Sequence, residues 1–478
     1  MKARGMNFAT SNSPRLRLLA LLASAALLGG CASFTPDGGF AVVEKTAKDR
    51  LGKDVQWARS DADQDSISKR VSELLSKPLT VDDAVQVALL NNRGLQATFQ
   101  ELGITEAEVV QAGRLPNPGF SFGRSSRGDE IELDRSLHLN IARLIALPFI
   151  VEIEARRFEQ IKALVAMSVL SLAADTRKAY YNALAAEETV RYMRQVKQAA
   201  DASAELARRM EQVGNFNKLQ RAREQVFYAD ASLNLARAEQ AQRSNRERLT
   251  RLMGAWGAQT QFTLPERLPD LPKQTMELPD IERIALAQRL DVQGAKLAAE
   301  QTARNLGLTR TTRFINVLEL NYQRNSSNEA PTQRGWEIAF ELPLFDWSGA
   351  RMARAEAVYM QTVHRAAETA VNARSEVREA YTAYRSAFDI ARYQRDEVVP
   401  LNQRIAEENV LRYNGMLIGV FELLADARTQ IASVNGSIQA LRDFWIAQAD
   451  LDMALIGKPS LAAAAGPAMA AEAAGAGH

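Results

Sequence analysis

Two long segments of this chain carry the same residues in the same order, which indicates that one structural unit occurs twice. The first copy spans about residues 79–254 and the second about residues 279–457. The shared landmarks are Ala88-Leu89 and Gln96 with Ala285-Leu286 and Gln293, Leu147-Pro148 with Leu342-Pro343, and Arg177 to Tyr180 with Arg378 to Tyr381. A repeat of this length is a whole unit copied once, rather than a short solenoid motif.

A second set of landmarks marks the points where helical hairpins are expected to reverse. Five residues recur at identical spacing, namely Gly214, Phe216, Leu219, Ala222 and Arg223, which return as Gly419, Phe421, Leu424, Ala427 and Arg428. We therefore place the hairpin turns at Gly214 and Gly419.

The first 30 residues have the features of a bacterial export signal. Basic residues precede an apolar run from Leu18 to Leu28, which is shorter than the roughly 20 residues that span a bilayer. The run ends in Leu28-Gly29-Gly30-Cys31, which resembles the lipobox at which bacterial lipoproteins are cleaved and acylated. Cys31 is the only cysteine, so it forms no disulfide within the chain. We predict a lipid on Cys31, the alternative being a small buried thiol. Ala32 favours the outer membrane, because lipoproteins held at the inner membrane often carry Asp at that position.

Charge and composition exclude several classes of function. The chain has 59 basic and 57 acidic residues, whereas a nucleic-acid-binding protein needs a clustered basic excess. No apolar stretch after residue 30 is long enough for a transmembrane helix, so a membrane crossing would require a closed β-barrel. The three histidines, His138, His364 and His478, lack metal-ligand spacing. There is also no phosphate-binding loop and no nucleophile elbow. We expect no enzymatic activity, no metal site and no cofactor beyond the lipid.

Four segments alternate polar and apolar residues as β-strands do. The apolar positions are Phe120 and Phe122, then Ile131, Leu133, Leu137, Leu139 and Ile141, then Leu318, Leu320 and Tyr322, then Trp336, Ile338, Phe340 and Leu342. Such strands fit a membrane barrel with a polar interior, or a small soluble sheet packed on helices. Four strands are too few to close a barrel, which needs about eight. Three copies of the chain would supply twelve strands.

Two segments of about 60 residues, 151–211 and 350–412, are expected to be continuous helices without Pro. Each would be about 90 Å long at 1.5 Å per residue. Each is followed by a turn and a shorter returning helix. Sparse apolar positions and many charges favour coiled-coil-like packing around a hollow, the alternative being a coiled-coil scaffold.

The duplicated strand pairs and hairpins behind a lipobox resemble the TolC-type outer-membrane efflux family, specifically its lipoprotein branch. The resemblance covers about residues 79–457. It rests on Leu342 to Trp347, on Arg412-Tyr413 through Gly419 to Arg428, and on Leu249 to Gly254 echoed by Leu451 to Gly457. It implies a mainly α fold in which a homotrimer forms a twelve-strand barrel in the outer membrane and an α-helical tunnel in the periplasm. It also implies a periplasmic adaptor and an inner-membrane transporter, of the resistance-nodulation-division type, as partners.

The resemblance further implies a periplasmic gate at the second hairpin turn. The family places two acids three residues apart there, whereas this chain has Glu422 and next Asp426. We expect these two to form an acidic ring in the trimer, the alternative being a solvated helix end. Arg412, Tyr413, Arg223 and Arg428 would supply the bonds that close the gate. In the first copy, the residues after Pro148 lack the Gly that usually follows this junction.

These expectations give a passive exit duct with six regions. They are a signal peptide (1–30), a lipid-anchored extended arm (31–78), the first repeat (79–254), a linker (255–278), the second repeat (279–457) and a disordered Ala/Gly-rich tail (458–478). The alternatives are a type I secretion duct, a periplasmic adaptor and a lipid-anchored scaffold without a pore. Drugs, metal ions, peptides and proteins would all suit such a duct as cargo.

Overall fold

The computed structural model describes residues 33–312, 318–340, 345 and 347–459. The predicted signal peptide, Cys31, Leu342-Pro343, His478 and nearly all of the predicted tail lie outside this part of the chain. The chain forms two compact units. The strand unit comprises Met1–Gly39, Leu102–Ile161 and Leu297–Val363, and the helical unit comprises Phe40–Glu101, Lys162–Lys296 and His364–His478. Among the described helices, none is long and apolar enough to cross a membrane.

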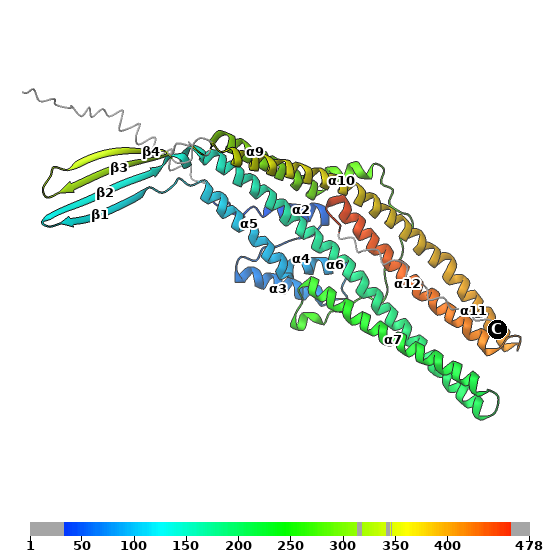
Figure 1. Cartoon of the computed structure of the whole chain (residues 1–478). Coiled ribbons are helices and arrows are strands. Elements are labelled where there is room, and N and C mark those ends of the chain that lie inside the picture. Colours follow the sequence, from blue (N-terminus) through cyan, green and yellow to red (C-terminus); the bar gives the residue numbers. More distant parts are fainter. Residues whose placement is uncertain (1–32, 313–317, 341–344, 346, 460–478) are drawn as a thin grey trace, which may run out of the picture. The chain divides into compact units, whose positions relative to one another are not determined.

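The strand unit contains one four-stranded antiparallel sheet, as the alternation predicts (Figure 1). Its strands are β1 (Gly119–Arg127), β2 (Glu130–Asn140), β3 (Leu318–Ser327) and β4 (Gln333–Phe340), in the order β1-β2-β3-β4. Gly128 and Asp129 alone connect β1 to β2, and Gly128 has φ +62°, a conformation that glycine adopts without strain. Ile141, predicted as the last strand residue, instead begins a helix.

The first long helix starts earlier than predicted. Helix α6 (Ile141–Gln212) has 72 residues and contains Pro148 in its interior, whereas the sequence placed the helix start near Val151. A proline removes one helical hydrogen bond but does not end the helix when neighbouring contacts hold the chain. Two turns after the proline, Arg156 lies 3.2 Å from Glu152 and 3.2 Å from Glu300 on α9 (Leu290–Thr312), which ties this part of α6 to α9 within the strand unit.

The second long helix runs over the predicted range 350–412 without a break but includes a π-helical turn, and the expectation that the range is free of Pro was wrong. Pro400 lies inside that range. Helix α10 (Gly349–Tyr393) passes into a π-helical turn, Gln394–Val398, and α11 (Val399–Asn414) follows it. The Pro400 ring lacks an N–H and would clash with the carbonyl four residues earlier, and a widened turn relieves that clash.

The segment expected to be an extended arm contains two helices, α2 (Ala41–Leu51) and α3 (Asp61–Leu75). Ser60 and Asp63 form a capping box at the start of α3, and Ile67 and Val71 on one face of α3 are buried. The extended prediction for this segment was therefore wrong. The remaining helices are α4 (Val81–Asn91), α5 (Arg93–Ala112), α7 (Lys218–Met253), a short 3₁₀ turn (Gly257–Thr260), α8 (Ile281–Gln288) and α12 (Val420–Ile456).

The duplication is confirmed at a helix break that both repeats share. Asn92 follows the last residue of α4 with φ −69° and ψ 115°, and Arg289 follows the last residue of α8 with φ −68° and ψ 124°. The Asn92 Nδ2 donates to the Leu252 carbonyl at 2.9 Å, and the Arg289 Nη1 donates to the Ala454 carbonyl at 3.3 Å. Each repeat therefore uses the residue at its break to hold the last turn of the returning helix, α7 or α12.

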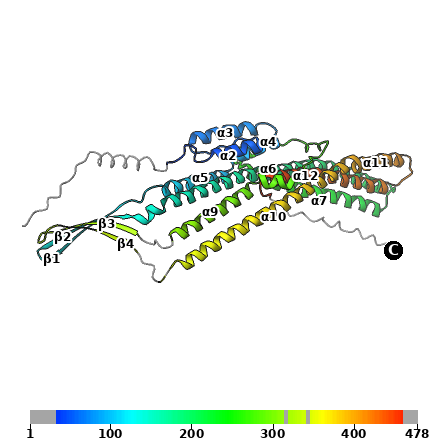
Figure 2. The same ribbon diagram turned by 90° about the horizontal axis from the view of Figure 1, so that it is seen from above.

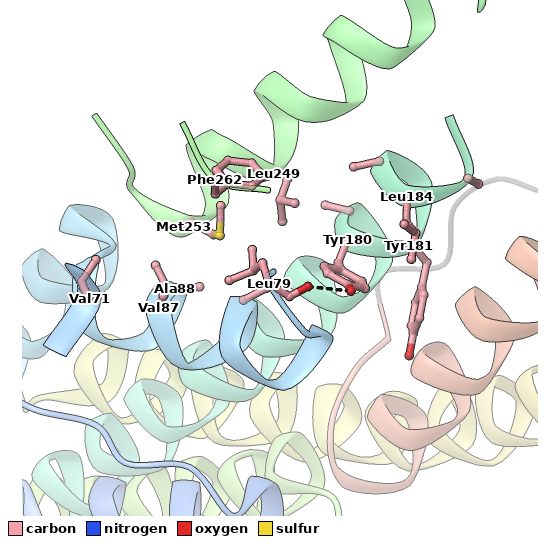
Figure 3. Close-up of a cluster of buried hydrophobic side chains, with 14 of the residues drawn as sticks. Val71, Leu79, Val87, Ala88, Tyr180, Tyr181, Leu184, Leu249, Met253 and Phe262 are labelled. Atoms are coloured by element: carbon pink, nitrogen blue, oxygen red, sulfur yellow. Dashed lines mark hydrogen bonds between the residues drawn. The ribbon is translucent and has the colours of Figure 1, made fainter. Parts of the chain in front are cut away.

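The helical unit has a core that includes residues from α4, α6 and α7 (Figure 3). The Tyr180 hydroxyl donates to the Leu79 carbonyl at 2.8 Å, and burial raises the pKa of Tyr180, so the hydroxyl keeps its proton. Around this bond pack Val87, Ala88, Leu184, Leu249, Met253 and Phe262. A second cluster of buried side chains includes residues of α10 and α12, among them Val377, Tyr384, Phe388, Phe444 and Leu451.

Candidate functional site

The first hairpin turn joins α6 to α7 and is closed by several specific contacts. Gly214 has φ +80°, which reverses the chain after α6. Asn217 caps α7 through a capping box with Gln220, in which both hydrogen bonds measure 2.8 Å. An ion pair of 2.7 Å between Arg221 and Glu211 links the two helices across the turn. This tip is held by both its backbone and its side chains.

The second hairpin turn joins α11 to α12 (Figure 2). It has fewer such contacts. Met416 has φ +59°, which is unfavourable for a residue with a Cβ, and its side chain is 93% exposed. Gly419 caps α12 without a side chain to bond the first N–H groups. Among the residues that the structure describes, no ion pair crosses this turn.

The two turns nevertheless share one backbone hydrogen-bond pattern. The Asn215 N–H donates to the Met210 carbonyl at 2.8 Å, and the Leu417 N–H donates to the Arg412 carbonyl at 2.8 Å. The structural partner of Gly214 is therefore Met416, and the partner of Asn217 is Gly419. The equally spaced landmarks of the sequence instead pair Gly214 with Gly419, which lies three residues after Met416, the structural partner of Gly214.

The two acids of the predicted ring differ in their surroundings. Glu422 lies in the first turn of α12 and is exposed. Asp426 is half-buried and accepts a hydrogen bond from the Asn409 side-chain amide of α11. Asp426 therefore also fastens α12 to α11, a role that the sequence did not predict.

A third carboxylate at the tips was missed in the sequence. Glu224 is only 2% exposed and accepts a hydrogen bond of 2.8 Å from the Ser203 hydroxyl of α6. It lies seven residues after the cap of α7, as Asp426 lies seven residues after the cap of α12. The sequence predicts this carboxylate only if the two repeats are aligned with Asn217 opposite Gly419, because that alignment places Glu224 opposite Asp426.

The four residues predicted to close the gate lie in two settings. The Arg428 guanidinium of α12 lies 4.8 Å from the centre of the Phe227 ring on α7, in cation–π contact. Arg223 lines a groove with Arg428, beside Leu219, Ala222, Glu224, Val226 and Ala425. The side chains of Arg412 and Tyr413 have no hydrogen bond or ion pair within the described residues. The structure thus brings Arg223 and Arg428 together but does not join Arg412 to Glu422.

The sheet carries its acids on one face only. In an antiparallel pair, residues opposite each other share a face, and the pairing puts His138, Asn321 and Glu337 in one row. The acids of this polar face are Glu130, Glu132, Asp134, Glu319 and Glu337. The described residues contain no group of three or more potential metal-ligating side chains. The acids of this face attract cations.

Comparison with known proteins shows that this fold is shared with solved outer-membrane channels. No family model matches the chain. The cobalt-zinc-cadmium resistance protein CzcC of Cupriavidus metallidurans is 24% identical over 281 residues, which cover 56% of this chain and 64% of that protein. The chain thus spans somewhat less than two thirds of the length of this relative.

Two solved structures illustrate the shared fold. The CmeC outer membrane channel of Campylobacter jejuni superposes with a TM-score of 0.69 at 16% identity, over 79% of this chain and 85% of that one. The outer membrane protein VceC of Vibrio cholerae superposes with a TM-score of 0.66 at 15% identity, over 79% of this chain and 96% of that one. The matched proteins are described as channels, outer-membrane proteins or resistance proteins, and not as enzymes.

Proposed function

We propose that this chain, which has the fold of the TolC-type outer-membrane channels, is the exit duct of a tripartite efflux system. One observation carries the proposal. A four-stranded sheet with one apolar and one polar face occurs in the same chain as two helical hairpins, one in each repeat. A sheet of this kind suits a lipid-facing exterior and a watery interior.

Closure of the duct requires more than one copy. In a single chain β1 and β4 have unpaired edges, and open sheet edges are not stable in lipid. A closed sheet needs about eight strands. Three copies in a ring supply twelve and satisfy closed symmetry. We therefore propose a homotrimer.

The remaining parts of the system are partners. We propose that a lipid on Cys31 holds the chain at the outer membrane. A periplasmic adaptor would connect the helical hairpins to an inner-membrane transporter of the resistance-nodulation-division type. This transporter would supply the energy, because the sequence has no phosphate-binding loop.

Divalent metal cations are the cargo class that we favour. The CzcC relative is named for cobalt, zinc and cadmium resistance. The acids of the polar face would line the interior of the trimer, and acid rings raise the local concentration of cations in a pore. The cargo would pass through without being bound, in keeping with the absence of a metal-ligating cluster among the described residues.

Planar-bilayer recording of the purified full-length oligomer tests the duct. A trimer with cation-selective conductance is expected, and a monomer that never conducts would contradict the proposal in favour of a scaffold without a pore. Deletion of the gene tests the cargo, with sensitivity to cadmium, zinc and cobalt compared with sensitivity to organic drugs. Sensitivity to drugs alone would overturn the cargo proposal and leave the duct intact.

A further inference from the structure

Three arginines form a row on the apolar face of the sheet. Arg135 of β2 lies directly opposite Arg324 of β3, which lies directly opposite Arg334 of β4. Arg124 of β1 is on the same face, opposite Leu133. Neighbouring like charges on one sheet face repel each other, so this row favours the binding of a negatively charged group.

The protein itself does not supply that charge. The paired residues of this face include no Asp or Glu, because the acids of the strands all lie on the polar face. Two further acids, Asp129 and Glu329, lie in the strand connections. Within the described residues, the four arginines make no side-chain hydrogen bond or ion pair. A second copy presents the same face, so the other chains of a trimer bring more arginines and no acid from the sheet.

The row lies at a definite level along the strands. Beside it, towards the helix ends of the strands, is a row with Leu137, Tyr322 and Trp336, and beyond that a row with Leu320 and Ile338. Aromatic residues of membrane sheets gather at the level of the lipid headgroups. From Leu318 to Arg324 is about 20 Å along the strand at roughly 3.4 Å per residue, and the arginine row lies one step beyond the aromatic row on this face. The arginines therefore lie at the headgroup level, on the side of the strand connections.

We propose that Arg135, Arg324 and Arg334 bind the phosphate groups of anionic lipids in the leaflet around the strand connections. Guanidinium groups bind phosphate oxygens in pairs and are less strongly hydrated than ammonium groups, which suits a site beside hydrocarbon. The exposure of Arg324 and Arg334 leaves them open to a headgroup. The inference rests on the proposed insertion of the sheet into the outer membrane.

The test uses the full-length oligomer in detergent micelles that contain either phosphatidic acid, a phosphomonoester lipid, or zwitterionic phosphatidylcholine. Bound lipid is counted by native mass spectrometry, with inorganic phosphate as a competitor. The triple variant Arg135→Gln, Arg324→Gln, Arg334→Gln is compared with the parent chain. The matched pair is Arg324→Gln and Arg127→Gln, because Arg127 is a strand arginine on the opposite face. A triple Arg→Lys variant keeps the charge if the Gln variant fails to assemble.

We expect selective binding of phosphatidic acid, about fivefold weaker in Arg324→Gln and about a hundredfold weaker in the triple Gln variant, from the attraction of a single basic residue at an anionic surface. Arg127→Gln and the triple Lys variant should keep selective binding. Equal binding by the parent and the triple Gln variant overturns the inference, as does full displacement by millimolar inorganic phosphate. Conductance of the same samples separates the two proposals. A conducting trimer without lipid selectivity overturns only the lipid site, whereas a protein that neither assembles nor conducts overturns the duct.

Discussion

The two hairpin turns have the same backbone hydrogen bonds, but the first is secured by side chains and the second is not. Asn217 caps α7 with a capping box, and the Arg221–Glu211 pair spans the turn. In the second turn Gly419 offers no capping side chain, and Met416 takes the left-handed conformation that Gly214 has in the first. Duplication has thus preserved the path of the chain while the contacts that hold it have diverged.

This difference indicates which hairpin opens more readily. Local opening is easiest where few buried contacts and few side-chain hydrogen bonds hold a segment. The Asn409–Asp426 hydrogen bond is the main polar contact between α11 and α12 near the second tip. We therefore expect the second hairpin to move in a gate and the first to act as its fixed support. Four experiments test this comparison.

The largest effect is expected where the returning helices end. Gly254 has φ +63°, and an added Cβ would lie 2.7 Å from the Asn91 carbonyl oxygen. Gly254→Ala should lower the free energy of unfolding by about 3 kcal/mol, from left-handed strain and overlap with backbone. Gly457 has an extended φ of −168°, and its Cβ would lie 2.7 Å from the terminal methyl of the flexible Met453 side chain and 3.8 Å from Met167, in ordinary contact. Gly457→Ala should cost less than about 1 kcal/mol. Denaturant unfolding followed by helical circular dichroism measures both, and equal losses would contradict the asymmetry.

The residues with positive φ at the two turns come next. Gly214→Ala should lower the free energy of unfolding by about 1–2 kcal/mol, because alanine is strained at φ +80°. Met416→Gly should raise the free energy of unfolding by about 0.5 kcal/mol, because relief of the same strain outweighs the added freedom of the unfolded chain. The same unfolding measurement applies. A loss of stability in Met416→Gly would show that the Met416 side chain makes contacts that offset its backbone strain.

The capping residues should have smaller effects of opposite sign. Asn217→Ala removes the bond that the Asn217 side chain accepts from the Gln220 N–H, but keeps the bond from the backbone N–H of residue 217 to the Gln220 side chain. It should lower the free energy of unfolding by about 1 kcal/mol. Gly419→Asn supplies the missing cap of α12 and should gain a few tenths of a kcal/mol, about the difference between Asn and Gly at this position. In bilayers Gly419→Asn should also open less often than the parent channel. An unchanged open probability would show that the cap of α12 does not affect opening of the gate.

The sequence was sufficient for the elements whose pattern repeats. Alternation of Leu318, Leu320 and Tyr322 found β3, and the paired landmarks found two hairpins. It failed where one residue changes the local geometry. Pro400 was overlooked, although a proline in a long helix demands a widened turn or an end, and the π-helical turn before it is the result. Ile141 fits both a strand face and a helix start, and periodicity alone does not separate the two.

The site was less predictable than the fold because its geometry depends on register. Residue identity favoured Gly214 with Gly419, whereas the hydrogen bonds pair Gly214 with Met416. Glycine is the usual residue at φ above zero, so a methionine there is invisible to a search for turn glycines. The buried Glu224 was missed for the same reason, since its counterpart Asp426 is found only in the structural register.

The smallest effect is expected from the charges of the second tip, and it decides between a gate ring and a solvated helix end. Glu422 is exposed, so its field is screened by salt within about 8–10 Å. Glu422→Gln with Asp426→Asn should lower the cation-to-anion permeability ratio about twofold, because three copies of each acid would face one pore. Glu44→Gln, at an exposed acid of α2, is the control and should leave the ratio unchanged.

Asp426→Asn alone should keep the hydrogen-bonding shape beside Asn409 but weaken that bond. It should therefore raise the open probability more than Glu422→Gln does. If neither variant changes selectivity, the acids belong to a solvated helix end, and Asp426 serves only to hold α12 against α11.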